Sequence, residues 1–174
     1  MRIISGSNGG QTIKVPKNFK LRPTTDQSKE GIFNIISNYY DVDKLEVLDL
    51  FSGTGNISYE FASRNAKKIT AVDKNIKCTN FINKMSLELD FNIKTITSDC
   101  FNFVLNTSDK FDIIFLDPPY NYNKYHEIKD LILEKKIIEN NGCLIIEHDK
   151  RTIFDDKNIE KRKYGSVFFT MFNL

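Results

Sequence analysis

Cysteine and histidine are scarce in this chain of 174 residues. The three cysteines (Cys78, Cys100 and Cys143) include no Cys-x-x-Cys pair, and an odd number at such wide spacing is typical of reduced, buried thiols. The two histidines, His126 and His148, are too few for a histidine-rich metal cluster. Because thiolates and imidazoles are the usual ligands of zinc, we expect no metal site in this chain.

Long hydrophobic runs are missing as well. The longest apolar runs, such as residues 113–116, have the length of a β-strand and fall far short of the roughly 18 residues that a membrane-spanning helix needs. Residues 1–6 lack the apolar segment of a secretory signal, so we expect a cytoplasmic protein with no membrane partner. An apolar content of 40% at this length is enough for the core of one domain, which excludes a fully disordered chain.

The charge is distributed unevenly, although the net charge is only +2. Residues 1–25 contain five basic residues and no acidic residue, whereas the rest of the chain contains 20 bases and 23 acids. A basic segment on a nearly neutral body indicates a polyanionic partner, although short basic runs are often plain solvated surface. We therefore predict that Lys14, Lys17 and Arg22 bind nucleic acid.

The beginning of the chain predicts a hairpin followed by a helix. An Asn-Gly turn joins two short strands within residues 2–15, since Asn-Gly supplies the positive-φ positions of a tight hairpin. Thr25 or Asp26 can cap the helix that follows. We assign residues 1–40 to this extension and residues 45–174 to the core of a single domain, 1–174.

From residue 45 onward, predicted strands and helices alternate. Apolar runs predict parallel strands at residues 47–51, 68–72, 93–97, 112–116 and 143–147. Apolar residues at helical spacing lie between the second and third strands and again before the fifth, where Asn140-Asn141-Gly142 is predicted to end the helix. Residues 162–172 predict a closing antiparallel hairpin. The pattern is that of an α/β sheet covered by helices on both faces.

A glycine-containing loop, Asp49-Leu50-Phe51-Ser52-Gly53-Thr54-Gly55, follows the first predicted strand. Glycines there let the chain turn sharply against a ligand, and the next helix offers free N–H groups. A dinucleotide fingerprint would have glycine or alanine where Ser58 stands, and Asp49 would repel a pyrophosphate. A carboxylate at this strand end suits an ammonium group, such as the one in the methionine part of S-adenosylmethionine.

Two more acids are predicted at strand ends. Asp73 closes the second strand, where it can accept hydrogen bonds from both ribose hydroxyls. Asp99 closes the third strand, where it can meet an adenine amino group. Each acid alone is equally well explained as a cap or a solvated charge. Together with the glycine loop, because ligands bind outside the carboxyl ends of such strands, they predict a nucleoside site.

The fourth predicted strand ends in Asp117-Pro118-Pro119-Tyr120. Two prolines fix the backbone and leave carbonyl oxygens without competing N–H groups. The Asp117 carboxylate and the Pro118 carbonyl can accept both hydrogens of an exocyclic base amine, which aims its nitrogen at an electrophile. Tyr120 can stack on a base that has left its helix. We interpret the loop as a catalytic loop for methyl transfer to an amine.

These two motifs resemble the amino-methyltransferases of the class I S-adenosylmethionine fold. A narrower resemblance, to the RsmD-type 16S ribosomal RNA guanine-N2 methyltransferases, is carried by Arg2-Ile3-Ile4-Ser5-Gly6, Leu21-Arg22-Pro23-Thr24-Thr25-Asp26, Ile32-Phe33-Asn34, Ser63-Arg64-Asn65-Ala66 and Tyr164-Gly165. The family implies a Rossmann-like, seven-stranded, mostly parallel sheet with an antiparallel closing hairpin, and transfer of a methyl group from S-adenosylmethionine. It implies cofactor contacts at Asp49, Phe51, Gly53, Gly55, Asp73 and Asp99 and catalysis at Asp117, Pro118, Pro119 and Tyr120.

The sequence departs from the family at two positions and leaves rival functions open. Asn65 stands where glycine is usual and Asp73 where glutamate is common. The nearest alternative is an adenine-N6 methyltransferase of RNA or DNA; more distant ones are a nicotinamide-dependent oxidoreductase and a non-catalytic RNA-binding module. We expect a monomer acting on ribosomal RNA or a partly assembled small ribosomal subunit. Glu147 and His148, at the end of the fifth strand, are interpreted as a solvated charge and a hydrogen-bonded structural histidine.

Overall fold

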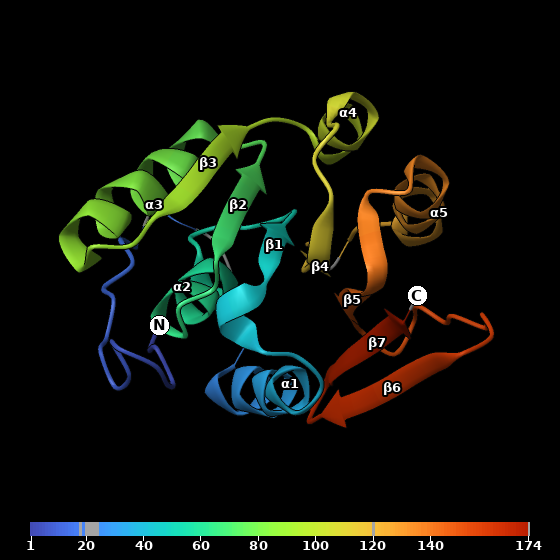
Figure 1. Ribbon diagram of the computed structural model, residues 1–174, viewed down its shortest axis with the longest axis horizontal. Helices are drawn as coiled ribbons and strands as arrows, with labels where there is room; N and C mark the ends of the chain where they lie inside the picture. The colour runs from blue at the N-terminus through green and yellow to red at the C-terminus, as the bar shows by residue number, and fades with distance from the viewer. Residues whose placement is uncertain (18, 20–24, 120, 174) are drawn as a thin grey trace.

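Five consecutive strands form the parallel part of a seven-stranded sheet in the computed structural model, which describes residues 1–17, 19, 25–119 and 121–173 (Figure 1). They are β1 (Glu46–Asp49), β2 (Lys68–Asp73), β3 (Ile93–Thr97), β4 (Phe111–Leu116) and β5 (Ile138–His148). The order across the sheet is β3-β2-β1-β4-β5-β7-β6. The predicted parallel α/β sheet is therefore confirmed.

The last two strands close the sheet. β6 (Ile159–Tyr164) and β7 (Val167–Asn173) pair antiparallel with each other, and β7 also pairs antiparallel with β5. Gly165 takes φ 62° in the tight turn between them, a left-handed conformation that glycine adopts without steric cost. This arrangement confirms the predicted closing hairpin.

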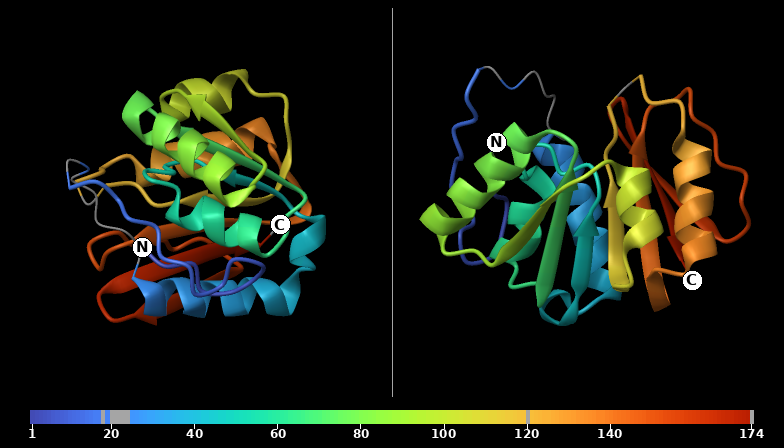
Figure 2. Two further views of the ribbon diagram at one scale, coloured as in Figure 1. Left: turned by 90° about the vertical axis from the view of Figure 1, so that its left-hand side faces the viewer. Right: turned by 90° about the horizontal axis from the view of Figure 1, so that it is seen from above.

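Helices cover both faces of the sheet (Figures 1 and 2). The α-helices of the described residues are α1 (Asp26–Tyr39), α2 (Asn56–Ser63), α3 (Ile76–Leu89), α4 (Cys100–Asn106) and α5 (Tyr125–Lys135), and a short 3-10 turn (Val42–Lys44) precedes β1. Side chains alternate along each strand, so Val47 packs in the core beneath α1 to α3 and Leu48 in the core beneath α4 and α5. Both residues are fully buried.

The N-terminal segment is attached to α2 by buried polar groups. Glu60 of α2 accepts hydrogen bonds from the backbone N–H groups of Ile4 and Ser5, at 2.8 and 3.1 Å. Lys29 of α1 lies 3.4 Å from the same carboxylate and donates to the Arg2 carbonyl at 2.6 Å. Both charged side chains are fully buried. The segment is thus fixed against α1 and α2 by these contacts.

Several boundaries differ from the sequence-based expectation. The N-terminal hairpin is reduced to a single antiparallel bridge between Arg2 and Thr12 rather than two strands. The prediction that residues 140–142 end a helix was wrong, because α5 ends at Lys135 and these residues lie inside β5. Helix α4 was not predicted. In the part of the chain that the structure describes, no helix has the length and apolarity needed to cross a membrane.

Candidate active site

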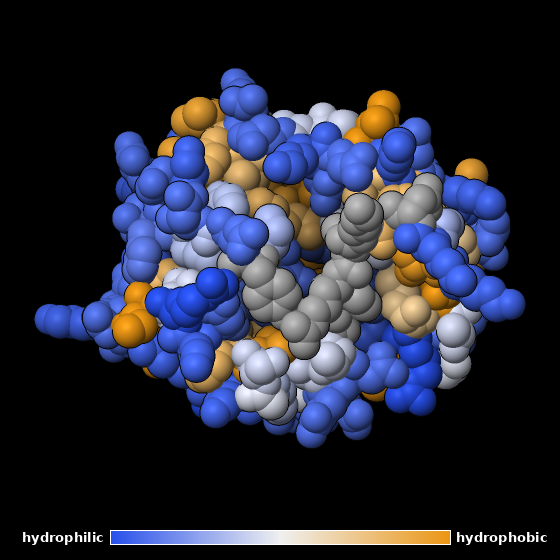
Figure 3. Space-filling model, turned by 180° about the vertical axis from the view of Figure 1, so that it is seen from behind, coloured by the Kyte–Doolittle hydropathy of each residue, from blue (hydrophilic) through white to orange (hydrophobic). Residues whose placement is uncertain are grey.

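The strand order reverses between β1 and β4, and a cavity opens at their carboxyl ends. In an open α/β sheet this reversal leaves a crevice, since the connecting loops run to opposite sides. The cavity has a volume of about 770 Å³ and is lined from both strand ends, including Asp49 after β1 and Asp117 after β4. Figure 3 shows the face behind that of Figure 1, where the surface is hollowed and hydrophobic atoms lie in the depth of the hollow.

The glycine loop and the end of β2 are joined by hydrogen bonds. Gly53, at φ 51°, donates its N–H to Oδ2 of Asp73 at 2.8 Å, and Asn75 donates its N–H to Oδ1 at the same distance. Gly55 begins α2 at φ 88°, and a Cβ there would lie 2.8 Å from the ring of Tyr59. Glycine is therefore required at position 55 both by conformation and by space.

Asp49 lies at the bottom of this loop. It is 1% exposed, and its Oδ2 accepts a hydrogen bond from the Ser58 hydroxyl at 2.6 Å. Burial raises the pKa of Asp49 to about 7, against the opposing effect of the Ser58 hydrogen bond. Ser58 thus has a local role that a glycine at that position would lack, which explains the departure from a dinucleotide fingerprint.

Asp99 differs from its predicted position. β3 ends at Thr97, and Asp99 caps the N-terminus of α4 by accepting hydrogen bonds at Oδ1 from the backbone N–H groups of Phe101 and Asn102. Asp99 therefore acts as a helix cap, as the sequence allowed alongside a contact with an adenine amino group. Asp99 also lines the cavity, so the cap holds its carboxylate beside the space above β2 and β3.

Acids predominate among the charged residues of the cavity wall. The described lining residues include the carboxylates Asp49, Asp73, Asp99, Asp117 and Glu147 against two lysines, Lys74 and Lys124. Such a lining favours hydrogen-bond donors and positive charge, and it disfavours a pyrophosphate. This electrostatic character argues against a nicotinamide dinucleotide and in favour of a cationic nucleoside. No group of three side chains suited to holding a metal ion occurs among the described residues.

The proline loop forms the wall opposite the glycine loop. Asp117, Pro118 and Pro119 all line the cavity, and the Pro119 carbonyl accepts the N–H of Tyr122 at 2.7 Å, which closes a turn. Tyr120, the last residue of the motif, lies outside the described residues, as does Arg22. Three of the four predicted catalytic residues are therefore brought to the same cavity as the predicted cofactor residues Asp49, Phe51, Gly53, Asp73 and Asp99.

Sequence reasoning missed an aromatic contact between the two loops. The ring of Tyr122 packs edge-on against Phe51, with centroids 5.2 Å apart, and its hydroxyl lies 3.6 Å from Sγ of Cys100. Burial raises the pKa of the Cys100 thiol, so this cysteine is a neutral, buried group as expected. A tyrosine two positions after the proline motif was the available signal. The contact holds the glycine loop and the proline loop in fixed relation.

The end of β5 also reaches the site. His148 is buried and hydrogen-bonded on both ring nitrogens, to the Asp149 carbonyl and the Thr170 hydroxyl, each at 2.8 Å. The interpretation of His148 as a structural histidine is confirmed. The interpretation of Glu147 as a solvated charge was wrong, because Glu147 is 8% exposed and lines the cavity.

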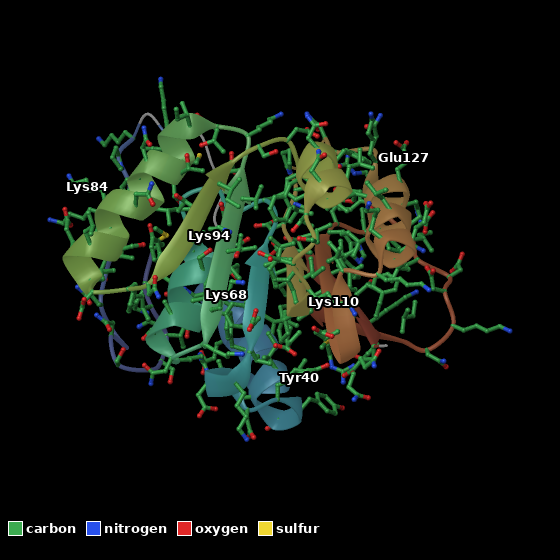
Figure 4. The ribbon with its side chains drawn as sticks, turned by 45° about the horizontal axis from the view of Figure 1, so that its top comes forward. Tyr40, Lys68, Lys84, Lys94, Lys110 and Glu127 are labelled. Carbon is green, nitrogen blue, oxygen red and sulfur yellow. The ribbon has the colours of Figure 1, made fainter. Side chains whose placement is uncertain are left out.

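Lys14 and Phe19, described residues of the basic segment, lie beside α3. Lys14 lines a second hollow of about 710 Å³, together with Lys77 and Lys84 of that helix. Lys17 is exposed but lines neither hollow. Figure 4 shows Lys84 on the outer side of α3, pointing away from the sheet. The structure therefore places helix lysines next to Lys14 that the sequence alone did not associate with it.

Comparison with known proteins relates the whole chain to one family. The family model described as Conserved hypothetical protein 95 matches residues 1–173. YlbH of Bacillus subtilis is 35% identical over 176 residues, covering 95% of this chain and 94% of YlbH. Ribosomal RNA small subunit methyltransferase D of Buchnera aphidicola is 31% identical over 150 residues, covering 86% of this chain and 76% of that protein.

Solved structures share the fold. A hypothetical protein of Thermus thermophilus superposes with a TM-score of 0.89 at 21% identity, covering 100% of this chain and 99% of that one. SMU.776, solved in complex with SAH, superposes with a TM-score of 0.66 at 16% identity, covering 84% of this chain and 49% of that one. At these identities the likeness establishes the fold alone, a Rossmann-like α/β fold.

Proposed function

The chain belongs to the Conserved hypothetical protein 95 family, the RsmD-type methyltransferases, and from that premise we propose that it methylates the N2 amine of a guanine in 16S ribosomal RNA. The observation that carries the proposal is the acid-lined cavity that has the glycine loop on one wall and Asp117-Pro118-Pro119 on the other. One cavity of this kind can hold a methyl donor and an amine acceptor at the same time. Its volume of about 770 Å³ lies within the usual range for cofactor and ligand sites.

The residues present fit S-adenosylmethionine, which supplies an electrophilic methyl group on a positively charged sulfur. Each oxygen of Asp73 receives one backbone N–H and retains a second lone-pair site for a ribose hydroxyl. Asp49 offers a carboxylate to the ammonium group of the methionine part. The loop residues Phe51, Gly53 and Gly55 would form the turn beside the donor, and the capped Asp99 would accept a hydrogen bond from the adenine amino group.

Asp117 and Pro118 would hold the accepting amine. The lone pair of a purine amine is delocalised into the ring, so acceptors on both N–H groups are needed to aim the nitrogen at the methyl carbon. A hydrogen bond to a charged group contributes about 1.5–3 kcal/mol, whereas alignment of the reacting atoms contributes about 7–11 kcal/mol. Positioning by the rigid proline loop is therefore the larger effect, and the Asp117 charge is the smaller one.

The RNA would approach across the basic segment. Lys14 lies in the hollow beside α3, whose first residues also border the cavity, and Lys17 and Arg22 belong to the same stretch of sequence. Tyr120, the residue after the two prolines in the sequence, would stack on the flipped base. We propose that a monomer in the cytoplasm acts on ribosomal RNA or on a partly assembled small subunit.

The proposal is tested by methyl transfer from labelled S-adenosylmethionine to small-subunit particles of a strain that lacks the gene. After digestion to nucleosides, mass spectrometry distinguishes N2-methylguanosine from N6-methyladenosine. We expect N2-methylguanosine at a single position. N6-methyladenosine would establish the adenine alternative instead, and no transfer to any RNA would contradict the proposed activity.

A matched binding measurement separates the proposal from a dinucleotide enzyme. S-adenosylhomocysteine should raise the melting temperature of the protein by mass action, whereas NAD should leave it unchanged. The acidic lining of the cavity is the physical reason for the difference, because it opposes the two negative charges of the pyrophosphate. Stabilisation by NAD alone would contradict the assignment.

A further inference from the structure

Glu147 lies beside Asp117 at the carboxyl edge of the sheet. Leu116, the last residue of β4, pairs with Ile146 of β5. The residues that follow these two in the chain, Asp117 and Glu147, are therefore neighbours at the carboxyl edge of the sheet. Glu147 lines the large cavity and also a small recess that it shares with Asp117 and Pro118. Its carboxylate therefore belongs to the wall that would face the acceptor base, across the cavity from the glycine loop.

Glu147 is a mostly buried acid in the cavity wall. It is 8% exposed and lines the cavity, where a carboxylate can accept a hydrogen bond from a bound group in addition to its contacts within the protein. Tyr125 lines the same recess. Its pKa is raised, mainly by burial and further by the negative charges of Asp117, Asp149 and Glu147. The side of the cavity next to the proline loop thus presents several acceptors together.

The edge of guanine matches this arrangement, and the edge of adenine does not. Guanine carries an N–H donor at N1 directly beside its N2 amine, whereas adenine carries an acceptor nitrogen at N1 beside its N6 amine. Enzymes that act on a flipped base read it by hydrogen bonds to this edge. A second carboxylate next to the one that holds the amine therefore satisfies guanine and repels the ring nitrogen of adenine.

We propose that Glu147 is the specificity-determining residue of this site, accepting the N1–H of the target guanine while Asp117 and Pro118 hold its N2 amine. The inference rests on the proposed function and deepens it, since the proline motif by itself serves guanine and adenine amines alike. Asp117 acts on the nitrogen that is methylated, and Glu147 acts on the neighbouring ring nitrogen. Glu147 then selects the base, and Asp117 aligns the amine.

A base analogue separates these two tasks. 2-Aminopurine keeps the N2 amine of guanine but has an acceptor in place of N1–H, so it presents the reacting group without the group that Glu147 reads. The test uses small-subunit RNA with guanine or 2-aminopurine at the mapped target position. It compares kcat/KM for methyl transfer by the wild type, Glu147→Gln and the control Glu127→Gln. Glu127 is an exposed glutamate on α5 that lines neither the cavity nor the small recess (Figure 4).

The wild type should prefer guanine over 2-aminopurine by about 10- to 100-fold, the range expected for one hydrogen bond to a charged group. Glu147→Gln replaces an acceptor by an amide that can also donate to N1 of 2-aminopurine, so this preference should fall by about 10-fold or more. Glu147→Asp keeps the charge and should keep the preference for guanine. Glu127→Gln should leave both substrates unchanged.

Two results would overturn the inference in different ways. Equal losses on both substrates in Glu147→Gln, with the preference for guanine intact, would show a structural role for Glu147 while the proposed methylation of guanine stands. Formation of N6-methyladenosine by the wild type would contradict the proposed function and the inference with it. Melting temperatures of all three variants confirm that each is folded before rates are compared.

Discussion

At the residue scale, Asp49 shows how burial alone changes the chemistry of a side chain. The pKa of its carboxyl group is raised to about 7 in the folded protein, against 3.8 for the ordinary group. Because the folded-state pKa is the higher one, the stabilising contribution is fully present below about pH 4 and is lost as the pH rises to about 7. The free protein therefore carries a neutral Asp49 in acid and a costly buried charge in base.

Asp49→Asn should for this reason stabilise the free protein increasingly as the pH rises. The amide oxygen still accepts the Ser58 hydrogen bond but carries no charge. The difference in the free energy of unfolding between Asp49→Asn and the wild type should grow by about 2–3 kcal/mol between pH 5 and pH 8 in urea titrations. A difference that is constant over this range would contradict the assigned environment. The same variant should bind S-adenosylmethionine more weakly at pH 8, because the ammonium group loses its counter-charge.

Asp117→Ala should separate catalysis from donor binding. The carboxylate contacts the acceptor amine in our proposal and not the donor, so kcat should fall by about 100-fold or more while the affinity for S-adenosylhomocysteine stays within about threefold. Isothermal titration calorimetry with S-adenosylhomocysteine measures the affinity, and a labelled-methyl assay measures kcat. Near-normal turnover would show that Asp117 has been given the wrong role.

The sequence identifies cavity-lining residues where an acid directly follows an apolar run. Asp49, Asp73 and Asp117 all follow this pattern, and all three line the cavity. Glu147 follows it too, after the apolar run 143–146, yet it was interpreted as a solvated charge because nothing in a linear sequence gives the depth of a strand end. Tyr122 was missed for a related reason: its partner Phe51 lies 71 positions away and meets it only in the folded chain.

At the scale of single elements, the attachment of the N-terminal segment to α2 depends on a close backbone approach. Gly6 takes φ 87°, and a Cβ there would lie 1.9 Å from the Ser63 carbonyl oxygen, which accepts the N–H of Ser7 at 2.7 Å. Gly10 takes nearly the same φ, 85°, but no atom lies within 4 Å of the position that a Cβ would take there. The two glycines therefore share a backbone conformation and differ in the space around them.

Alanine at these positions should separate strain from crowding. Gly10→Ala introduces only the strain of the left-handed backbone, which costs about 1–2 kcal/mol in the free energy of unfolding. Gly6→Ala should cost clearly more, because the segment must move away from α2 and lose its hydrogen bonds to Ser63 and Glu60. Urea unfolding of both variants measures the difference. Equal costs would mean that the close approach to α2 contributes nothing to stability.

The elements themselves were predictable to the extent that local pattern determines them. Period-2 or continuous apolar runs located all five parallel strands, and β3 was predicted with the bounds that it has. The failure at residues 140–142 has a tertiary cause. Lys136 ends α5 in a left-handed conformation, at φ 52°, and Gly142 lies so close to the Asp112 carbonyl that a Cβ would be 2.7 Å from it. Residues 140–142 have a sequence typical of a turn, but their contact with β4 places them in a strand.

At the scale of the whole molecule, the lysines near the amino ends of the strands differ in their surroundings from Lys14. Lys14 lines the hollow beside α3 together with Lys77 and Lys84. Lys68, Lys94 and Lys110 lie toward the amino end of the strands and are paired with acids: Lys68 and Lys94 with Asp109, and Lys110 with Glu139 (Figure 4). We propose that RNA binds on the side of Lys14 and not on the side of Lys68, Lys94 and Lys110.

Reversal of charge at Lys14, Lys17 and Arg22 should therefore weaken RNA binding and reduce its dependence on salt. Each lost phosphate contact lowers the slope of log K against log salt by about 0.7–0.9, so three contacts remove about 2–3. The matched control reverses Lys68, Lys94 and Lys110 and should change the slope by less than about 1. Binding to small-subunit RNA over a salt series gives both slopes. Unchanged binding in the first variant would locate the RNA surface elsewhere.

Methyl transfer as proposed requires the methyl group of the donor to face the proline loop. A crystal structure of the protein with S-adenosylmethionine measures this relative position. We expect the methyl carbon to point toward the Pro118 carbonyl and the Asp117 carboxylate, leaving room for an amine nitrogen about 3–3.5 Å from the methyl carbon. A methyl group directed away from that loop, or a donor bound outside the cavity between β1 and β4, would contradict the proposal.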